Sequence, residues 1–328
     1  MSDADTDAGS SINGVQETDD HFEDTGNAIP IGLALGSGGA RGWAHIGVIR
    51  GLRKVGIEAD IVCGTSVGAL VGAVHLGGDL DALEAWAQGL GKLSLLRYLD
   101  YRMIGGGFIA GRKIQNLLET SLGDIMIEDL KRPFAAVATD LTTGHEVWLR
   151  NGSLAEAARS SFALPGILPP VPSDGQLLAD GALVNPIPVS VCRALGSRLV
   201  IAVNLNTDHL GRRPDHHAAF GMPTDGDAVV NRRAKSRKRD KSLIGQFIGR
   251  DHSNVSLYSV MVASLNVFQD RLTRIRLASD PPDVTITPHV GHIGLLEFDR
   301  AAEVVQEGED AVERALPTLR EALDILGG

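Results

Sequence analysis

Residues 64–68 combine a serine with two glycines at the spacing that many serine hydrolases use. Gly64-Thr65-Ser66-Val67-Gly68 follows the short apolar run Ala59–Cys63 and leads into a stretch of small and apolar residues. A strand, a sharp turn and a helix form the context in which a nucleophilic serine sits on an elbow at a helix N-terminus. Gly64 and Gly68 are expected there because a side chain would clash with the neighbouring strand or helix. Ser66 is therefore a candidate nucleophile; the alternative is a tight turn in which serine only caps the helix.

A second glycine-rich segment, Gly36–Gly42, follows the apolar run Ile29–Leu35. Bare backbone N–H groups beside a nucleophile can form an oxyanion hole, and Gly38 and Gly39 are the best candidate donors. Three roles are open for Arg41: it could anchor this loop, contact an anionic head group or be an ordinary surface residue. Arg41 also occupies the third glycine position of a dinucleotide fingerprint, and the phosphate-loop lysine is missing, so nucleotide binding is only a minor alternative. We expect no cofactor.

A serine nucleophile needs a base, and the sequence offers one well-placed aspartate and ten histidines. Asp180 follows the short run Gln176–Ala179, and Gly181 permits a sharp exit from that strand. A carboxylate there could contact Ser66 Oγ directly, although Asp-Gly is also an ordinary turn pair. None of the histidines lies in a context typical of a catalytic histidine loop. A Ser-His-Asp hydrolase remains an alternative, with these candidates: His209, His216, His217, His252, His289 and His292.

The elements that must position these residues alternate between strand and helix. The alternation predicts an α/β fold with three α/β/α layers and a mainly parallel central sheet. Strands are predicted over 29–35, 59–63, 134–140, 145–149, 176–179, 199–205 and 283–287. Helices are predicted over 43–55, 67–76, 79–99, 112–122, 154–161, 186–195, 256–277 and 296–326. Ser160 and Ser161 lack an elbow, so we expect them at a helix surface or in packing contacts.

Charge and composition divide the chain into four parts. Residues 1–28 form an acidic leader, predicted to be disordered, whose eight acidic residues account for most of the net charge of −10. Residues 29–206 form the catalytic core, and 252–328 complete the domain. Between them, 207–251 is a predicted mobile insertion containing a basic run, Arg232–Lys241. That run fits anionic lipid head groups, a solvated loop or nucleic acid; scarce aromatic residues (4%) and a nearly neutral body disfavour the last.

The location of the protein is predicted from what the sequence lacks. The N-terminal residues have no basic segment followed by an apolar one, so no signal peptide is expected. The longest apolar run, Ile61–Leu76, is too short and too interrupted to span a membrane. Cys63 and Cys192 lie in apolar surroundings and are interpreted as buried thiols in a reducing compartment. We expect a cytoplasmic protein that contacts the membrane surface peripherally.

Four sequence blocks taken together resemble the patatin-like phospholipase family, particularly its bacterial branch related to neuropathy target esterase. The resemblance covers residues 31 to about 195. Its blocks are GSGGARG (36–42) with the following GWAHIGVIRGL, GTSVGALVGA (64–73), ARSSFALPGILPPV (158–171) and DGALVNPIPVSV (180–191).

The resemblance implies a catalytic dyad in place of a triad. Ser66 would be the nucleophile, Asp180 the general base, and the amides of Gly38, Gly39 and Ala40 the oxyanion hole, with no metal. Ser37 departs from the glycine that the family often has, but a loop that acts through its backbone tolerates this change. The implied substrates are phospholipids, lysophospholipids or simpler acyl esters. A lipid-binding or regulatory protein without catalytic activity remains the alternative on the same fold.

Overall fold

The computed structural model describes residues 29–90, 100–101, 109–110, 112–206 and 257–327. The predicted acidic leader and basic insertion lie outside these residues, so they stay predictions, as do the domain boundaries that rest on them.

In the described part of the chain, eight strands form one sheet in the order β10-β9-β1-β2-β5-β8-β7, with β6 paired to β5 outside this path. The strands are β1 (Ile31–Leu35), β2 (Ile61–Thr65), β5 (Phe134–Asp140), β6 (Glu146–Leu149), β7 (Val171–Ser173), β8 (Gln176–Asp180), β9 (Leu199–Val203) and β10 (Val284–Ile286). β10, β9, β1, β2 and β5 run parallel, whereas β6, β7 and β8 pair antiparallel. A separate pair joins β3 (Asp100–Tyr101) and β4 (Ile109–Ala110). The predicted mainly parallel sheet is confirmed.

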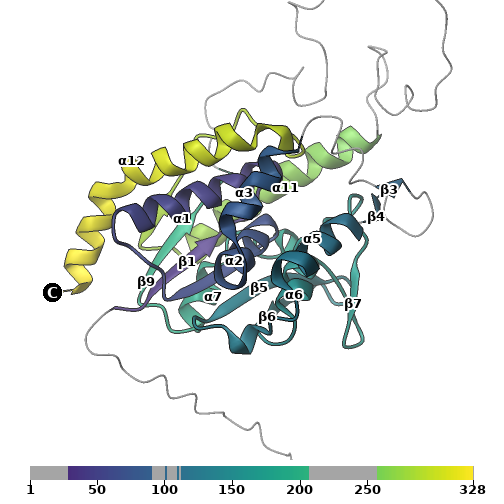
Figure 1. Cartoon of the computed structure of the whole chain (residues 1–328), viewed down its shortest axis with the longest axis horizontal. Coiled ribbons are helices and arrows are strands. Elements are labelled where there is room, and N and C mark those ends of the chain that lie inside the picture. Colours follow the sequence, from purple (N-terminus) through teal and green to yellow (C-terminus); the bar gives the residue numbers. More distant parts are fainter. Residues whose placement is uncertain (1–28, 91–99, 102–108, 111, 207–256, 328) are drawn as a thin grey trace, which may run out of the picture.

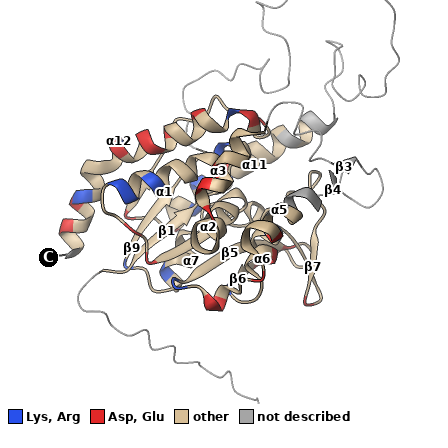
Figure 2. Ribbon diagram, in the orientation of Figure 1, with Lys and Arg blue, Asp and Glu red and all other residues tan. Residues whose placement is uncertain are grey.

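Helices cover both faces of this sheet (Figure 1). They are α1 (Ala44–Lys54), α2 (Val67–Gly77), α3 (Leu80–Gln88), α5 (Arg112–Leu122), α6 (Leu154–Ser161), α7 (Val189–Ala194), α11 (Leu257–Ser279) and α12 (Ala301–Gly327). Alternate strand residues point to opposite faces, so Leu33 and Val62 join the core under α1, α2 and α12, while Ala34 and Cys63 pack with α7. Figure 2 shows charges on the outer helices, whereas β1, β2 and β9 carry none. The three-layer prediction is confirmed.

Several predicted boundaries differ from the structure. The helix predicted over 79–99 ends at Gln88, where Gly89 caps it, and 91–99 lie outside the described residues. α7 begins only at Val189 because Pro188 stands at its N-cap. α12 begins at Ala301, after a 3-10 turn. The unpredicted strand β7 holds Pro172, which an edge strand tolerates. None of the described helices combines the length and hydropathy needed to cross a membrane.

The pairing of β5 brings two chain segments to one point. Thr65, at the end of β2, lies opposite Val137, and Asp180, at the end of β8, lies opposite the next residue, Ala138. β6 occupies one side of β5 at both positions, so β2 and β8 must share the other side. Because β8 runs antiparallel to β5, its end meets the end of β2. Ser66 and Asp180 are thereby brought together from 114 residues apart.

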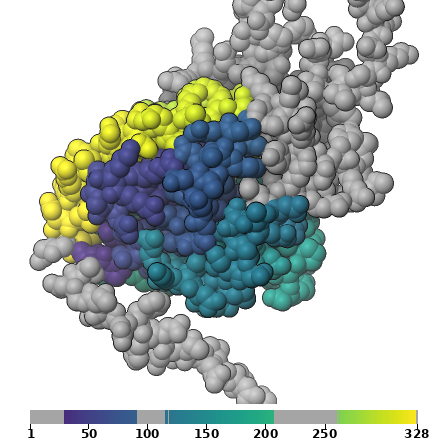
Figure 3. Space-filling model, in the orientation of Figure 1, coloured from purple at the N-terminus to yellow at the C-terminus, as the bar shows by residue number. Residues whose placement is uncertain are grey.

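Two helices far apart in the sequence, α1 and α12, lie side by side along one face (Figure 3). Glycines allow the close approach: a Cβ at Gly47 would lie 1.9 Å from the Val305 carbonyl oxygen, and one at Gly308 would lie 2.1 Å from that of Ala44. α1 follows the glycine loop directly, so this packing also fixes where the loop ends.

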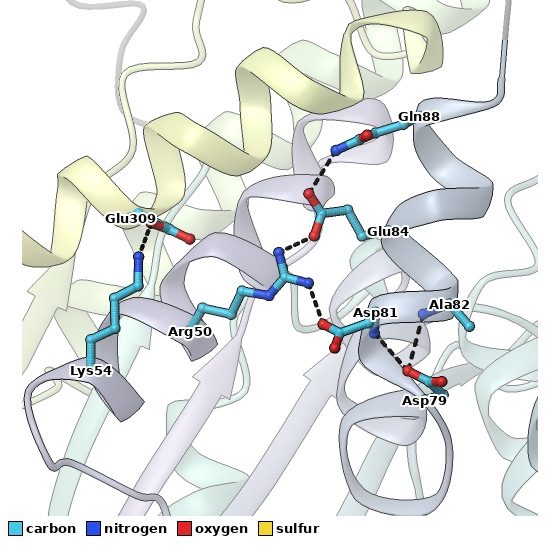
Figure 4. A network of polar contacts seen from close by, with 8 residues as sticks. All are labelled: Arg50, Lys54, Asp79, Asp81, Ala82, Glu84, Gln88 and Glu309. Atoms are coloured by element: carbon cyan, nitrogen blue, oxygen red, sulfur yellow. Dashed lines mark hydrogen bonds and ion pairs between the residues drawn. The ribbon is translucent and has the colours of Figure 1, made fainter.

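Polar contacts at the surface join α1 to both α3 and α12 (Figure 4). Arg50 of α1 pairs with Asp81 and Glu84 of α3, and Lys54 pairs with Glu309 of α12. Surface pairs of this kind contribute about 0–1 kcal/mol each. The close helix packing is therefore the larger contribution to holding α1 in place.

We expect Gly47→Ala to lower the free energy of unfolding by about 2 kcal/mol or more, because the new methyl group forces α1 and α12 apart. This cost exceeds the gain of about 1 kcal/mol in helix propensity. Gly89→Ala is the matched control, since its Cβ would meet no atom nearer than 3.3 Å. Urea unfolding measures both variants; equal midpoints for the two would contradict the packing argument.

Candidate active site

Ser66 sits on a strained turn between β2 and α2. Its backbone angles are φ 59° and ψ −124°, and it is one of two non-glycine residues with positive φ in the described chain. Such strain persists only where the surroundings enforce it. A Cβ at Gly64 would lie 2.4 Å from the Ala69 nitrogen, and one at Gly68 would lie 2.2 Å from the Leu35 oxygen. The two glycines therefore let α2 turn back against the sheet, as expected.

Ser66 Oγ donates a hydrogen bond of 2.6 Å to Asp180 Oδ2. Asp180 is fully buried, and Ser66 is only 5% exposed. The other carboxylate oxygen, Oδ1, accepts from the Ala182 N–H at 2.8 Å. The backbone of Asp180 is held as well, because its N–H donates to the Ala163 carbonyl and its carbonyl accepts from Thr139 Oγ1. The carboxylate thus has one orientation, facing the serine.

Burial raises the pKa of Asp180 to about 7, although its hydrogen bonds from Ser66 and the Ala182 N–H act in the opposite direction. The cause is desolvation, which disfavours the charged carboxylate. A carboxyl group with a pKa near neutrality can accept a proton and return it under physiological conditions.

Ser161, at the end of α6, also supports the elbow. Its Oγ accepts from the Ser66 N–H at 2.9 Å and donates to the Val137 carbonyl at 2.5 Å. The side chain is fully buried. Sequence reasoning placed Ser161 at a helix surface or in packing, and missed that it bonds to the candidate nucleophile. Only its place in the block 158–171, without a role of its own, pointed to it.

The glycine loop is held at its start by hydrogen bonds to Pro186, which precedes α7, and to His45 of α1. The Ser37 N–H donates to the Pro186 carbonyl at 2.8 Å. His45 is fully buried, and burial lowers its pKa to about 4, so the ring is neutral at physiological pH. Its Nε2 lies 2.7 Å from the Gly36 carbonyl oxygen, to which the neutral ring donates. These contacts set the direction in which the loop leaves β1.

The three oxyanion-hole donors implied by the resemblance differ in their hydrogen bonding. The Ala40 N–H already donates to the Leu295 carbonyl at 2.9 Å, so it is not available to a substrate in this conformation. The Gly38 and Gly39 N–H groups have no hydrogen-bond partner within the described chain. The loop lies against the elbow, since a Cβ at Gly42 would meet the Val67 side chain at 2.1 Å. Gly38 and Gly39 remain the candidate donors.

Arg41 is buried, with 1% exposure, which rules out an ordinary surface arginine. Its guanidinium donates to Asn266 Oδ1 of α11 at 2.8 Å and to the Leu205 carbonyl at 3.4 Å. Burial lowers its pKa to about 10, which still leaves it charged. These contacts favour the interpretation of Arg41 as a loop anchor over a contact to a lipid head group.

No described histidine is hydrogen-bonded to Ser66 or Asp180. Of the triad candidates, His292 pairs with Glu303 at the surface, and the backbone N–H of His289 donates to Glu307. The other four candidates, His209, His216, His217 and His252, lie outside the described residues. Cys63 and Cys192 are free buried thiols, as expected. Within the described part, His, Cys, Asp and Glu do not gather into a group able to hold a metal.

Comparison with known proteins places the chain in a family. Residues 33–193 match the family model described as patatin-like phospholipase. An uncharacterised NTE family protein of Mycobacterium tuberculosis is 32% identical over 338 residues, covering 89% of this chain and 92% of the relative. The neuropathy target esterase sws of Drosophila melanogaster is 37% identical over 190 residues, which are 56% of this chain and 13% of that protein.

The fold has a solved counterpart in VipD from Legionella pneumophila, with a TM-score of 0.52 and 14% identity, covering 89% of this chain and 67% of that one. At this identity the likeness concerns the fold alone. Family membership rests on the sequence matches, which extend over nearly the whole length of the mycobacterial relative. This chain belongs to the patatin-like phospholipase family, in the branch that includes the NTE family proteins.

Proposed function

We propose that this protein is a serine acyl hydrolase that cleaves lipid esters with a dyad of Ser66 and Asp180. The observation that carries the proposal is the buried 2.6 Å hydrogen bond from Ser66 Oγ to Asp180 Oδ2 on a strained elbow. Beside it lie two loop amides that have no hydrogen-bond partner among the described residues. A nucleophile, a base with a pKa near neutrality and candidate oxyanion donors thus lie together.

The reaction has two stages. Ser66 Oγ attacks the ester carbonyl carbon while its proton passes to Asp180 Oδ2, and the carbonyl oxygen becomes an oxyanion that accepts from the Gly38 and Gly39 amides. The C–O bond to the leaving alcohol breaks as Asp180 returns the proton to that alcohol. Asp180 then takes a proton from water, the hydroxide attacks the acyl-enzyme, and Ser66 Oγ leaves with the proton. No metal is needed for either stage.

A lipid ester is the substrate class that the surroundings favour. Leu164, Ile167, Leu168 and Leu295 form an apolar cluster separate from the main core. The cluster borders the site, because the Leu295 carbonyl bonds to the glycine loop and Leu164 follows Ala163, which bonds to Asp180. Apolar surroundings of this kind suit an acyl chain. The names of the relatives, phospholipase and esterase, agree with this class. We further propose a cytoplasmic location with peripheral contact to membranes.

We expect Ser66→Ala to abolish cleavage of a nitrophenyl acyl ester and Asp180→Asn to lower kcat about a hundredfold to ten-thousandfold. The second loss is expected because an amide cannot accept the serine proton. Asp174→Asn is the matched control: Asp174 lies in the β7–β8 turn with φ 47°, a conformation that asparagine also adopts. Circular dichroism confirms that each variant is folded.

Retained activity in folded Ser66→Ala would refute the dyad hydrolase. Normal activity in Asp180→Asn combined with its loss on replacing one histidine would favour the triad. Failure of a fluorophosphonate probe to label Ser66 in the wild type would favour a lipid-binding protein without catalysis.

Ser161→Ala tests the support of the elbow. The substitution leaves the buried Ser66 N–H without a partner, at a cost of about 1–3 kcal/mol. We expect kcat to fall about tenfold or more with little change in KM, since the nucleophile and not the substrate contact is displaced. Ser160→Ala removes the neighbouring hydroxyl from the same helix end and should leave kcat unchanged. Equal kcat values for the two variants would show that Ser161 does not position Ser66.

A further inference from the structure

The outer face of α11 is unusually apolar for a surface helix. Large apolar side chains more than a third exposed are few in the described chain, and four of the ten lie on α11. They are Val260 (43% exposed), Val267 (62%), Phe268 (47%) and Ile275 (63%). Residues 260, 267 and 275 are seven or eight positions apart and Phe268 adjoins Val267, so the four lie along one side of a helix with 3.6 residues per turn. Packing within the described part of the chain leaves this apolar stripe exposed.

The charge on this face is a single arginine. Arg271 is exposed, lies on the same side of the helix as Phe268 and Ile275, and has no ion pair within the described chain. The neighbouring charges of α11 are compensated, since Arg274 pairs with Asp270 and Arg276 pairs with Glu146. The exposed side of α11 therefore presents apolar groups and one free guanidinium, without an acid, in a chain whose net charge is −10.

The inner face of the same helix contacts the candidate active site. Asn266 accepts the hydrogen bond from Arg41 of the glycine loop. Leu265 packs against the apolar cluster of Leu164, Ile167, Leu168 and Leu295. A surface that bound the outer face of α11 would thus lie one helix away from the loops around Ser66. In Figure 1, α11 lies at the edge of the molecule behind α3.

We propose that the outer face of α11, formed by Val260, Val267, Phe268, Arg271 and Ile275, docks the protein onto an anionic phospholipid surface. The apolar side chains enter the boundary between head groups and acyl chains, and the Arg271 guanidinium meets a phosphate. The inference rests on the proposed function, which needs the site to reach lipid esters. It adds which face of the protein touches the lipid.

The charge pattern favours a lipid surface over a second copy of the chain. Two copies of this face packed together would bury two Arg271 guanidinium groups among apolar side chains with no acid to pair them, which is costly. An anionic bilayer supplies the missing negative charge and accepts the apolar groups at once.

The test uses the full-length protein and sedimentation with vesicles of phosphatidylcholine, alone or mixed equally with phosphatidylglycerol. Phe268→Ser/Ile275→Ser should lower the partition coefficient about tenfold or more on the mixed vesicles, because less apolar surface is buried. Arg271→Glu should lower the partition coefficient about fivefold or more on the mixed vesicles only. Added salt should reduce the difference in partition coefficient between this variant and the wild type. Ile325→Ser (71% exposed) and Arg320→Glu, both on α12, are matched controls and should bind like the wild type.

Measurements of hydrolysis distinguish the docking proposal from the proposed hydrolase function on which it rests. The α11 variants should keep wild-type cleavage of a soluble short-chain ester and lose cleavage of vesicle phospholipid. Wild-type protein that cleaves the ester but does not sediment with vesicles overturns the docking face and leaves the hydrolase intact. Binding that depends on α11 without any ester cleavage overturns the hydrolase and supports the docking face. Unchanged binding in the α11 variants, with a dimer of the wild type becoming a monomer, would assign the face to a second copy.

Discussion

The hydrogen bond between Ser66 and Asp180 depends on β5, because β2 and β8 both pair with the same edge of this strand. β2 pairs with this edge up to Val137, and β8 continues from Ala138 in the opposite direction, so the two strand ends meet. Because Asp180 is buried, desolvation disfavours its charged carboxylate and raises its pKa to about 7. The pairing of three strands thus sets both the geometry and the proton affinity of the site.

The contacts that support this site come from the middle of the chain and from its C-terminal part. Ser161 fixes the Ser66 amide, and the Ala163 carbonyl fixes the backbone of Asp180, so one end of α6 holds both residues. The glycine loop is held by Asn266 and Leu295, which lie beyond the region 33–193 matched by the family model. The C-terminal elements therefore do more than cover the sheet. Leu295 occupies the Ala40 amide, and α11 carries the face that we propose for docking onto lipid.

Much of the fold could be predicted from the sequence, because buried parallel strands appear as apolar runs and the elbow as glycines at a fixed spacing. The resemblance supplied Asp180 as the partner of Ser66, and the topology explains how they meet. The roles of Ser161 and Leu295 could not be predicted, since each depends on a contact across the fold: a serine in a helix, or a backbone carbonyl, has no sequence signal of its own. For the same reason Ala40 was assigned as a donor although Leu295 occupies its amide.

The most direct measurement of the central claim is the pH dependence of Ser66 acylation, followed in single turnover with a chromogenic ester between pH 5 and pH 9. Only ionised Asp180 can accept the serine proton, so the acylation rate should rise with pH. It should reach half its maximum at a pH of about 7, which matches the raised pKa of Asp180, and stay constant at higher pH. In Asp180→Asn the residual rate should lose this inflection. A rate independent of pH in the wild type, or the same inflection in Asp180→Asn, would contradict the role of Asp180 as the base.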